Sequence, residues 1–84
     1  MVAVKLQILL FGRVSDALGH RLEATIPEAG CTLGELRRLI AEQTGSDALS
    51  QKGVRASIDK QVAGDDAFVR PGAEVAFFSV FSGG

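Results

Sequence analysis

The residues best placed to do chemistry are Gly83 and Gly84, the last two residues of the chain. They follow an apolar run from Glu74 to Phe81 that has the composition of a β-strand. Glycine is costly to order and has no side chain to pack, so this segment offers only its backbone, its reach and a free carboxylate. The stretch from Phe81 to Gly84 spans at most about 14 Å when extended. A frayed chain end is the alternative interpretation.

Few other side chains form a pattern that supports catalysis. His20 lies in a predicted turn, and we expect no catalytic role for it. Cys31 precedes a predicted helix N-terminus, which can lower the pKa of a thiol, but it is far in sequence from Gly84 and we expect it to be structural. Nothing clusters with Asp65 and Asp66 at the spacing of metal ligands, so we expect a solvated loop there and no metal site. The chain therefore carries a reacting carboxylate without an obvious set of catalytic groups.

The composition describes one small globular domain. The chain has 84 residues, of which 46% are hydrophobic and 23% charged. The net charge is −1 and no run of lysine or arginine is present, so nucleic-acid binding has little support. No apolar stretch reaches membrane-spanning length, and the first residues do not resemble a signal peptide, so we expect a cytoplasmic protein. The single cysteine excludes an internal disulfide.

The first part of the chain predicts a pair of strands. Residues 2–11 alternate in the manner of a strand with one strongly apolar face, and Gly12 ends it. Residues 13–18 could form one helical turn. Residues 21–26 alternate again as a second strand that ends at Pro27. Because the link between the two strands is short, they should pair as antiparallel neighbours.

A helix is predicted to follow Thr32. Thr32 and Glu35 have the spacing of a capping box, in which each side chain accepts a hydrogen bond from the other residue's backbone N–H. Gly45 is a suitable residue to end the helix. The predicted apolar stripe consists of Leu33, Leu36, Leu39 and Ile40. The predicted solvent-facing side consists of Glu35, Arg37, Arg38, Glu42 and Gln43.

The rest of the chain predicts three more strands. Residues 54–58 and 61–63 flank a polar turn, and residues 70–73 have Pro and Gly at the central positions of a type II turn. The last strand, residues 74–80, is the most apolar, so it belongs in the middle of the sheet, most simply beside the first strand. This order predicts the α+β class, with a mixed sheet and one main helix packed across it.

Three stretches of the chain resemble the β-grasp (ubiquitin-like) sulfur carriers, especially the small subunits of molybdopterin synthase. Residues 10–14, Leu-Phe-Gly-Arg-Val, look like that family's Phe-Phe-Ala-Arg-Val. Residues 56–59, Ala-Ser-Ile-Asp, resemble its Ala-Val-Asn segment. Residues 71–78, Pro-Gly-Ala-Glu-Val-Ala-Phe-Phe, look like its Asp-Gly-Asp-Glu-Val-Ala-Phe-Phe, and the Gly-Gly ending is shared. The resemblance covers essentially the whole chain and implies the β-grasp fold.

The chain departs from the family pattern at three places. Ser79-Val80 stands where the family often has Pro-Pro, and Ser15-Asp16 where it often has Arg-Glu. Asp59 takes the place of Asn. These departures concern partner contacts and not the glycine ending.

The resemblance implies a β-grasp domain over residues 1–80, a flexible tail over residues 81–84, and a reaction at Gly84. An E1-like adenylating enzyme would use ATP to activate the Gly84 carboxylate, and a sulfur donor protein would convert it to a thiocarboxylate. Gly83 would provide clearance in a narrow channel. The large subunit of molybdopterin synthase, joined with the carrier in a heterotetramer, would use this sulfur to convert cyclic pyranopterin monophosphate to the molybdopterin dithiolene. The chain would not be an enzyme on its own, and would bind no cofactor tightly and no metal.

The phenylalanines near the chain end predict a surface for these partners. Phe77 and Phe78 should point to opposite faces, so that one joins the core. We expect Phe11, Phe78 and Phe81 to form an exposed apolar patch that docks a partner, with Arg13 at its rim. Plain core packing, and a solvated Arg13, are the alternatives.

Three functional interpretations remain open at the level of sequence. The first is the sulfur carrier of molybdopterin synthase. The second keeps the fold and changes the pathway to thiamine or another sulfur-containing metabolite. The third is a ubiquitin-like modifier that joins its terminal glycine to an amine, or a pure binding module.

Overall fold

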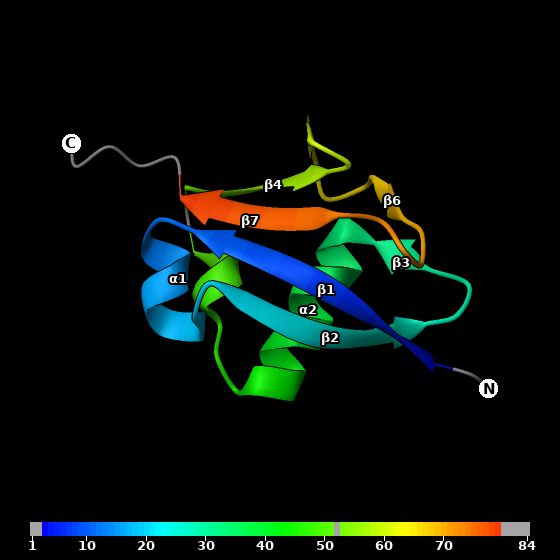
Figure 1. The fold of residues 1–84 in the computed structure, drawn as a ribbon, viewed down its shortest axis with the longest axis horizontal. Coiled ribbons are helices and arrows are strands. Elements are labelled where there is room, and N and C mark those ends of the chain that lie inside the picture. Colours follow the sequence, from blue (N-terminus) through cyan, green and yellow to red (C-terminus); the bar gives the residue numbers. More distant parts are fainter. Residues whose placement is uncertain (1–2, 52, 80–84) are drawn as a thin grey trace.

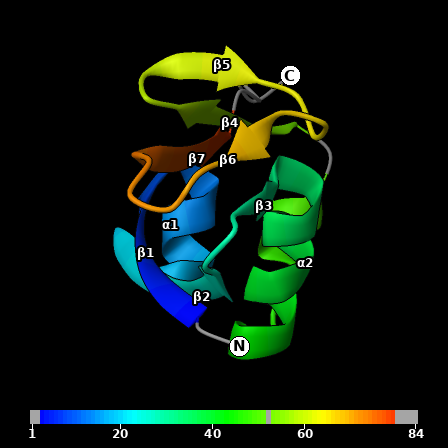
Figure 2. The same ribbon diagram turned by 90° about the vertical axis from the view of Figure 1, so that its right-hand side faces the viewer.

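A five-stranded sheet packs one face against a long helix, α2, and a shorter helix, α1, lies at one end of the sheet (Figure 1, Figure 2). The computed structural model describes residues 3–51 and 53–79. Its elements in chain order are β1 (Ala3–Phe11), α1 (Arg13–Leu18), β2 (Arg21–Pro27), β3 (Cys31–Thr32), α2 (Leu33–Thr44), the 3-10 helix η1 (Ala48–Ser50), β4 (Val54–Ile58), β5 (Gln61–Ala63), β6 (Phe68–Val69) and β7 (Val75–Ser79). None of the helices among these residues has the length and apolar character needed to cross a membrane.

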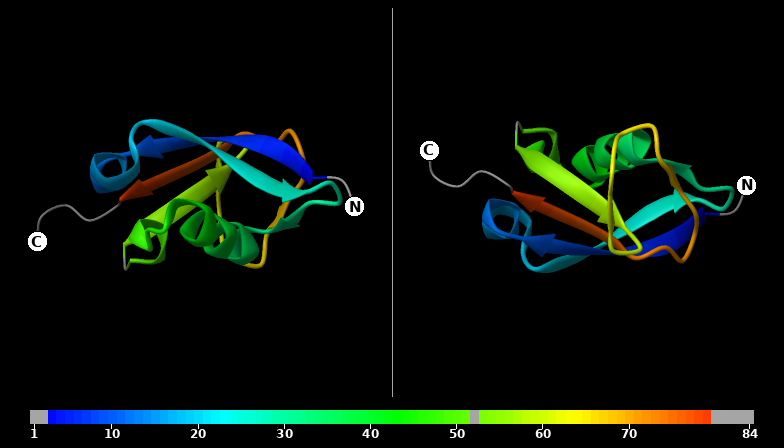
Figure 3. Two further views of the ribbon diagram at one scale, coloured as in Figure 1. Left: turned by 90° about the horizontal axis from the view of Figure 1, so that it is seen from below. Right: turned by 90° about the horizontal axis from the view of Figure 1, so that it is seen from above.

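Strand β7 lies in the centre of the sheet, whose order is β2-β1-β7-β4-β5. It runs parallel to β1, with Ile8 opposite Val75, and antiparallel to β4 (Figure 3). β1 and β2 form the expected antiparallel pair, with Leu6 opposite Ala24. The predicted central position of the last strand beside the first is therefore confirmed, as is the α+β class with a mixed sheet.

The hydrophobic core lies between the sheet and α2. Alternate residues of each strand point inward, as the period of two in the sequence predicts. Complete burial of one large apolar side chain contributes about 1.5–3 kcal/mol to stability. The largest fully buried side chains are Phe77, Leu6, Ile8, Leu10, Ile26, Leu33, Leu36, Ile40, Leu49, Val69 and Val75.

Helix α2 begins and ends where the sequence predicts. Its predicted solvent-facing side differs from the prediction at one residue. Thr32 Oγ1 accepts a hydrogen bond from the Glu35 N–H at 3.1 Å, and Glu35 Oε1 accepts one from the Thr32 N–H at 2.8 Å. Gly45 ends the helix in the left-handed region at φ 73°. The predicted solvent-facing side is wrong at Arg37, whose side chain is only 15% exposed. The reason is that this flank of α2 faces β4 and the loop before β6.

Two turns position the start of β7. Asp59 and Lys60 form the turn between β4 and β5 with φ of 51° and 71°, the left-handed values that a tight hairpin turn requires. The Asp59 N–H donates to the Glu74 carbonyl at 2.8 Å, and the Asp59 carboxylate accepts from the Glu74 N–H at 3.0 Å. Gly72, at φ 88°, supplies the left-handed position of the predicted type II turn across residues 70–73.

A second, two-stranded sheet was not predicted. Cys31 pairs with Val69, and Thr32 with Phe68, in the antiparallel ladder of β3 and β6. Each strand has two residues, which is too short for alternation to reveal it. The pair holds the N-terminus of α2 against the segment that leads into β7.

Candidate functional site

The predicted site residues of the described chain meet where β1 and β7 end side by side. Phe11 and Phe78 are direct partners in the parallel register of these strands. Phe11 is 53% exposed and Phe78 is partly exposed, whereas Phe77 is completely buried. The two neighbouring phenylalanines of β7 thus point to opposite faces of the sheet, and Phe78 is the one on the outer face.

This surface includes two further residues, Leu9 and Ala76, that the sequence analysis did not predict. Leu9 and Ala76 are direct partners two positions earlier in the same register, and therefore on the same outer face. Both are partly buried. Leu9, Phe11, Ala76 and Phe78 are hereafter the outer apolar patch. The signal that could have found Leu9 and Ala76 is the parallel register itself, because residues two positions apart on each strand share one face.

Gly12 turns the chain from β1 into α1 beside the end of β7. Its φ of 72° and ψ of −144° belong to a region open almost exclusively to glycine. A Cβ atom at this position would lie 3.3 Å from the Ser79 Cβ atom. Arg13, the first residue of α1, is exposed two positions after Phe11. Arg13, the predicted rim residue, therefore begins α1 just beyond the turn at Gly12, two positions after the patch residue Phe11.

Strand β7 ends at Ser79. The predicted site residues Phe81, Gly83 and Gly84 lie outside the residues that the structure describes. The described part of the candidate site is the outer face around the end of β7, from which the sequence continues to Gly84.

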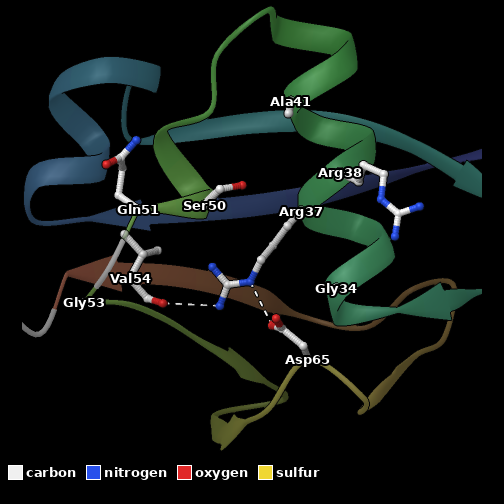
Figure 4. Close-up of a pocket in the computed structure, with 9 residues that line it drawn as sticks. All are labelled: Gly34, Arg37, Arg38, Ala41, Ser50, Gln51, Gly53, Val54 and Asp65. Atoms are coloured by element: carbon white, nitrogen blue, oxygen red, sulfur yellow. Dashed lines mark hydrogen bonds and ion pairs between the residues drawn. The ribbon is translucent and has the colours of Figure 1, made fainter.

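A cavity of about 460 Å³ lies on the helix side of the sheet (Figure 4). Arg37 points from α2 across this cavity and donates to Asp65 at 2.9 Å and to the Val54 carbonyl at 3.2 Å. Its guanidinium also donates to the Leu49 carbonyl and lies 5.2 Å from the centre of the Phe77 ring. Each of the three guanidinium nitrogens thus donates to a protein oxygen, and Arg37 links α2 to η1, β4 and the loop after β5.

The surroundings of Cys31 raise the pKa of its thiol. A helix N-terminus can lower the pKa of a thiol, but burial raises the pKa of the Cys31 thiol, and the nearby Glu35 carboxylate raises it further. Cys31 is a buried core residue. A thiol of this kind is a poor nucleophile at neutral pH, which agrees with the structural role expected for it.

Two carboxylates are held in their ionised form by hydrogen bonds. The Glu74 backbone N–H, with a smaller contribution from the Arg70 guanidinium, lowers the pKa of Asp59. The Thr32 backbone N–H and hydroxyl lower the pKa of Glu35. Both groups stabilise local structure. Within residues 3–51 and 53–79, His, Cys, Asp and Glu side chains form no group that could hold a metal ion.

Comparison with known proteins agrees with this architecture. The solved structure of SAMP1 from Haloferax volcanii has a TM-score of 0.76 and 16% identity, covering 96% of this chain and 100% of that one. A Pyrococcus furiosus protein assigned as molybdopterin converting factor, subunit 1, has a TM-score of 0.74 and 18% identity, covering 93% of this chain and 99% of that one. At these identities the likeness shows the fold, which is the predicted ubiquitin-like β-grasp.

The amino-acid sequence matches one family model. No curated protein sequence matches the chain. The model of the ThiS family matches residues 8–84, which is most of the chain and includes all four residues of the outer apolar patch. The chain therefore belongs to the ThiS family of ubiquitin-like sulfur carriers.

Proposed function

We propose that this chain is the sulfur carrier of a molybdopterin synthase, with Gly84 as the residue that carries the sulfur. The observation that carries the proposal is the pairing of Phe11 with Phe78 on the outer face, at the end of the strand that leads toward Gly84. An apolar surface at that position suits a partner protein that must receive the tail. Family membership supports the carrier role, and the fold shared with the Pyrococcus furiosus protein supports the molybdopterin pathway.

The proposed chemistry starts from an unreactive group. A carboxylate is a poor electrophile because its charge is delocalised and oxide is a poor leaving group. In the adenylating enzyme, a Gly84 carboxylate oxygen attacks the α-phosphorus of ATP and pyrophosphate leaves. Sulfide from a sulfur donor protein then attacks the acyl carbon, a C–S bond forms, the C–O bond to the phosphate breaks, and AMP leaves. The product is a thiocarboxylate at Gly84.

The thiocarboxylate is the nucleophile of the second stage. Its sulfur attacks the substrate carbon in the large subunit, and a C–S bond forms there as a C–O bond of the substrate breaks and the oxygen departs with its phosphate or as water. Water then cleaves the resulting thioester, which leaves a thiolate on the substrate and restores the Gly84 carboxylate. Two carriers deliver the two sulfur atoms of one dithiolene. The acid and base groups belong to the large subunit, so this chain is the sulfur-donating, non-catalytic subunit. Phe11, Arg13, Phe78 and Phe81 are proposed to dock it there, with Gly83 as the residue that fits the channel.

Mass spectrometry of the protein purified from its own host tests the carrier role. A thiocarboxylate adds the mass difference between sulfur and oxygen, which methionine or cysteine oxidation closely mimics. The tryptic fragment that follows Lys60 removes this ambiguity, because residues 61–84 contain neither methionine nor cysteine. We expect the increase on that fragment and its loss when Gly84 is deleted. An unmodified fragment from cells that are making the product contradicts the carrier role.

Deletion of Gly84 in the host then tests the pathway. The proposal predicts loss of molybdoenzyme activity with thiamine synthesis intact. Loss of thiamine synthesis alone would instead assign the chain to that pathway. Intact molybdoenzyme activity after the deletion overturns the proposal.

A ubiquitin-like modifier is the second candidate, because the chain shares its fold with SAMP1 over nearly its full length. A modifier uses the same adenylated glycine but transfers it to a lysine amine. Covalent ladders on other proteins that depend on Gly84 would favour this function.

A further inference from the structure

Helix α2 covers part of the free edge of strand β2. This strand forms one edge of the sheet (Figure 1), and its seven residues make it longer than the three-residue strand β5 at the other edge. On the free side of β2, the Thr25 N–H donates to Gln43 Oε1 at 2.9 Å, and Gln43 Nε2 donates to the Thr25 carbonyl at 2.8 Å. A neighbouring strand would make the same two hydrogen bonds with Thr25. The side-chain amide of Gln43 thus takes the place of one residue of a further strand.

The backbone groups of β2 point alternately toward β1 and toward the free edge. Thr25 directs both of its groups to the free edge, so Arg21 and Glu23, which lie at even spacing from it, direct theirs the same way. The Leu10 N–H donates to the His20 carbonyl at 2.9 Å, which agrees with an inward direction for the even-numbered residues of this segment. The free edge therefore presents the backbone of the odd-numbered residues.

Two of the outward residues of β2 cannot pair with a further strand in the usual way. Pro27 belongs to the outward set but has no N–H to donate. The groups of Thr25 are taken by Gln43. Exposed strand edges are templates for pairing with another chain, and proline and short length are common protections against it. Without Gln43, the open edge would lengthen from Arg21 and Glu23 to three successive outward residues.

A second copy of the chain has an edge that complements this one. Two β2 strands paired antiparallel about a twofold axis at Leu22 would place Arg21 of each copy opposite Glu23 of the other. Opposite charges at directly opposed positions stabilise a pair of strands. The same register places Gly19 of one copy opposite Thr25 of the other, which is the position that Gln43 covers. Complete pairing in this register therefore requires the Gln43 side chain to leave Thr25.

We propose that the β2 edge is a self-association surface of this chain and that Gln43 keeps it closed. The proposal goes beyond the sulfur chemistry proposed for Gly84 and does not depend on it. While Gln43 is in place, a second copy must break two hydrogen bonds in each chain before it can pair at Thr25. When Gln43 is replaced, the second copy displaces only water there, and the pairing gains hydrogen bonds without losing any within the chain.

Sedimentation equilibrium of the purified chain over a wide range of concentrations tests the proposal. Gln43→Ala removes the amide and preserves the helix, because alanine has the highest helix propensity. The dissociation constant of the dimer should be at least about tenfold lower for this variant than for the wild type, because two hydrogen bonds per copy no longer oppose pairing. Gln51→Ala is the matched control, because Gln51 is an exposed glutamine outside α2 and β2. It should leave the dissociation constant unchanged.

Charge variants in the Gln43→Ala background test the register. Arg21→Glu would place like charges opposite each other and should raise the dissociation constant about tenfold. Adding Glu23→Arg reverses both charges, restores the complementary pairs and should restore the dimer. Hydrogen exchange measured by NMR locates the surface, because the Arg21 and Glu23 amides should exchange more slowly in the dimer than in the monomer.

Three results would overturn the proposal. The first is a Gln43→Ala chain that dimerises no more tightly than the wild type, and the second is a Gln51→Ala chain that gains as much. The third is a dimer that neither responds to the charge variants nor protects the β2 amides, because it would use another surface. Each of these results leaves the proposed function standing, since none of them tests the reaction at Gly84.

Discussion

Gly12 and Ser79 approach so closely that a Cβ atom on Gly12 would lie 3.3 Å from the Ser79 Cβ atom. The contact joins the exit of β1 to the last residue of β7. Two strands that are neighbours in the sheet are thus also fixed to each other at the end where the sequence leaves the sheet toward Gly84.

Gly12→Ala should destabilise the protein more than Gly19→Ala. Both glycines have positive φ, 72° and 86°, so alanine is strained at either position by about 1–3 kcal/mol. Only Gly12 adds a steric conflict, because the nearest atom to a Cβ on Gly19 is 4.0 Å away. We expect a further loss of about 1 kcal/mol at Gly12 in urea unfolding. Equal losses would show that the contact with Ser79 relaxes without cost.

Phe78→Asp should preserve the fold and weaken docking. Phe78 is partly exposed on the outer face, where an aspartate can stay in water. An aromatic residue at the centre of an interface commonly contributes about 2 kcal/mol or more, so the Kd for the large subunit should rise at least about 30-fold. Titration calorimetry measures the affinity and thermal unfolding checks the fold.

Phe77→Asp is the contrasting variant for this test. Phe77 is completely buried, so a carboxylate there should abolish folding. If Phe78→Asp unfolds the chain in the same way, then Phe78 belongs to the core and the docking role is wrong.

Arg37→Met should cost about 1–3 kcal/mol of stability. Methionine keeps the apolar stem but leaves the Leu49 and Val54 carbonyls without their guanidinium donor. Asp65→Asn, which removes only the ion pair of a side chain that is 64% exposed, should cost less than about 1 kcal/mol. The urea midpoints of the two variants show whether Arg37 stabilises the fold mainly through its hydrogen bonds to the two carbonyls or through the ion pair with Asp65. Similar midpoints would mean that the backbone carbonyls find water when Arg37 is absent.

The stability of the protein should fall in acid partly through Asp59. The folded state lowers the pKa of this carboxyl, so its contribution is complete above the unfolded pKa of about 3.9 and is lost as the pH falls through the lower folded value. Asp59→Asn keeps an oxygen acceptor for the Glu74 N–H and tolerates the left-handed turn, but it does not titrate. Unfolding free energies measured from pH 6 to pH 3 should therefore decline less steeply for the variant. Identical slopes would assign the acid sensitivity to other groups, Glu35 among them.

Much of the fold follows from local patterns in the sequence. The capping box of Thr32 and Glu35, the left-handed stop at Gly45 and the alternation of β1 each involve residues a few positions apart, and all three appear as predicted. The apolar character of the last strand was enough to place it in the centre of the sheet. These features are fixed by short-range geometry and by burial on both faces.

The features that were missed depend on contacts between distant segments. A helical wheel assigns Arg37 to solvent because it contains only the residues of the helix. In the folded chain, Arg37 donates to the carbonyls of Leu49 and Val54, which come from later segments. The two-residue strands β3 and β6 are likewise invisible until they pair. Leu9 and Ala76 joined the candidate site only once the parallel register was known.

The parallel pairing of β1 with β7 has a consequence for folding during translation. Ile8 can pair with Val75 only after Val75 has been synthesised. The sheet therefore lacks its central strand, β7, while the ribosome translates the intervening segments. Pairings this distant in sequence also fold slowly, because a long loop must close before they form. A nascent chain that stalls before Val75 leaves the inward face of β1 without its neighbour. Interrupted translation should therefore yield fragments for proteases and chaperones, and not partially assembled carriers.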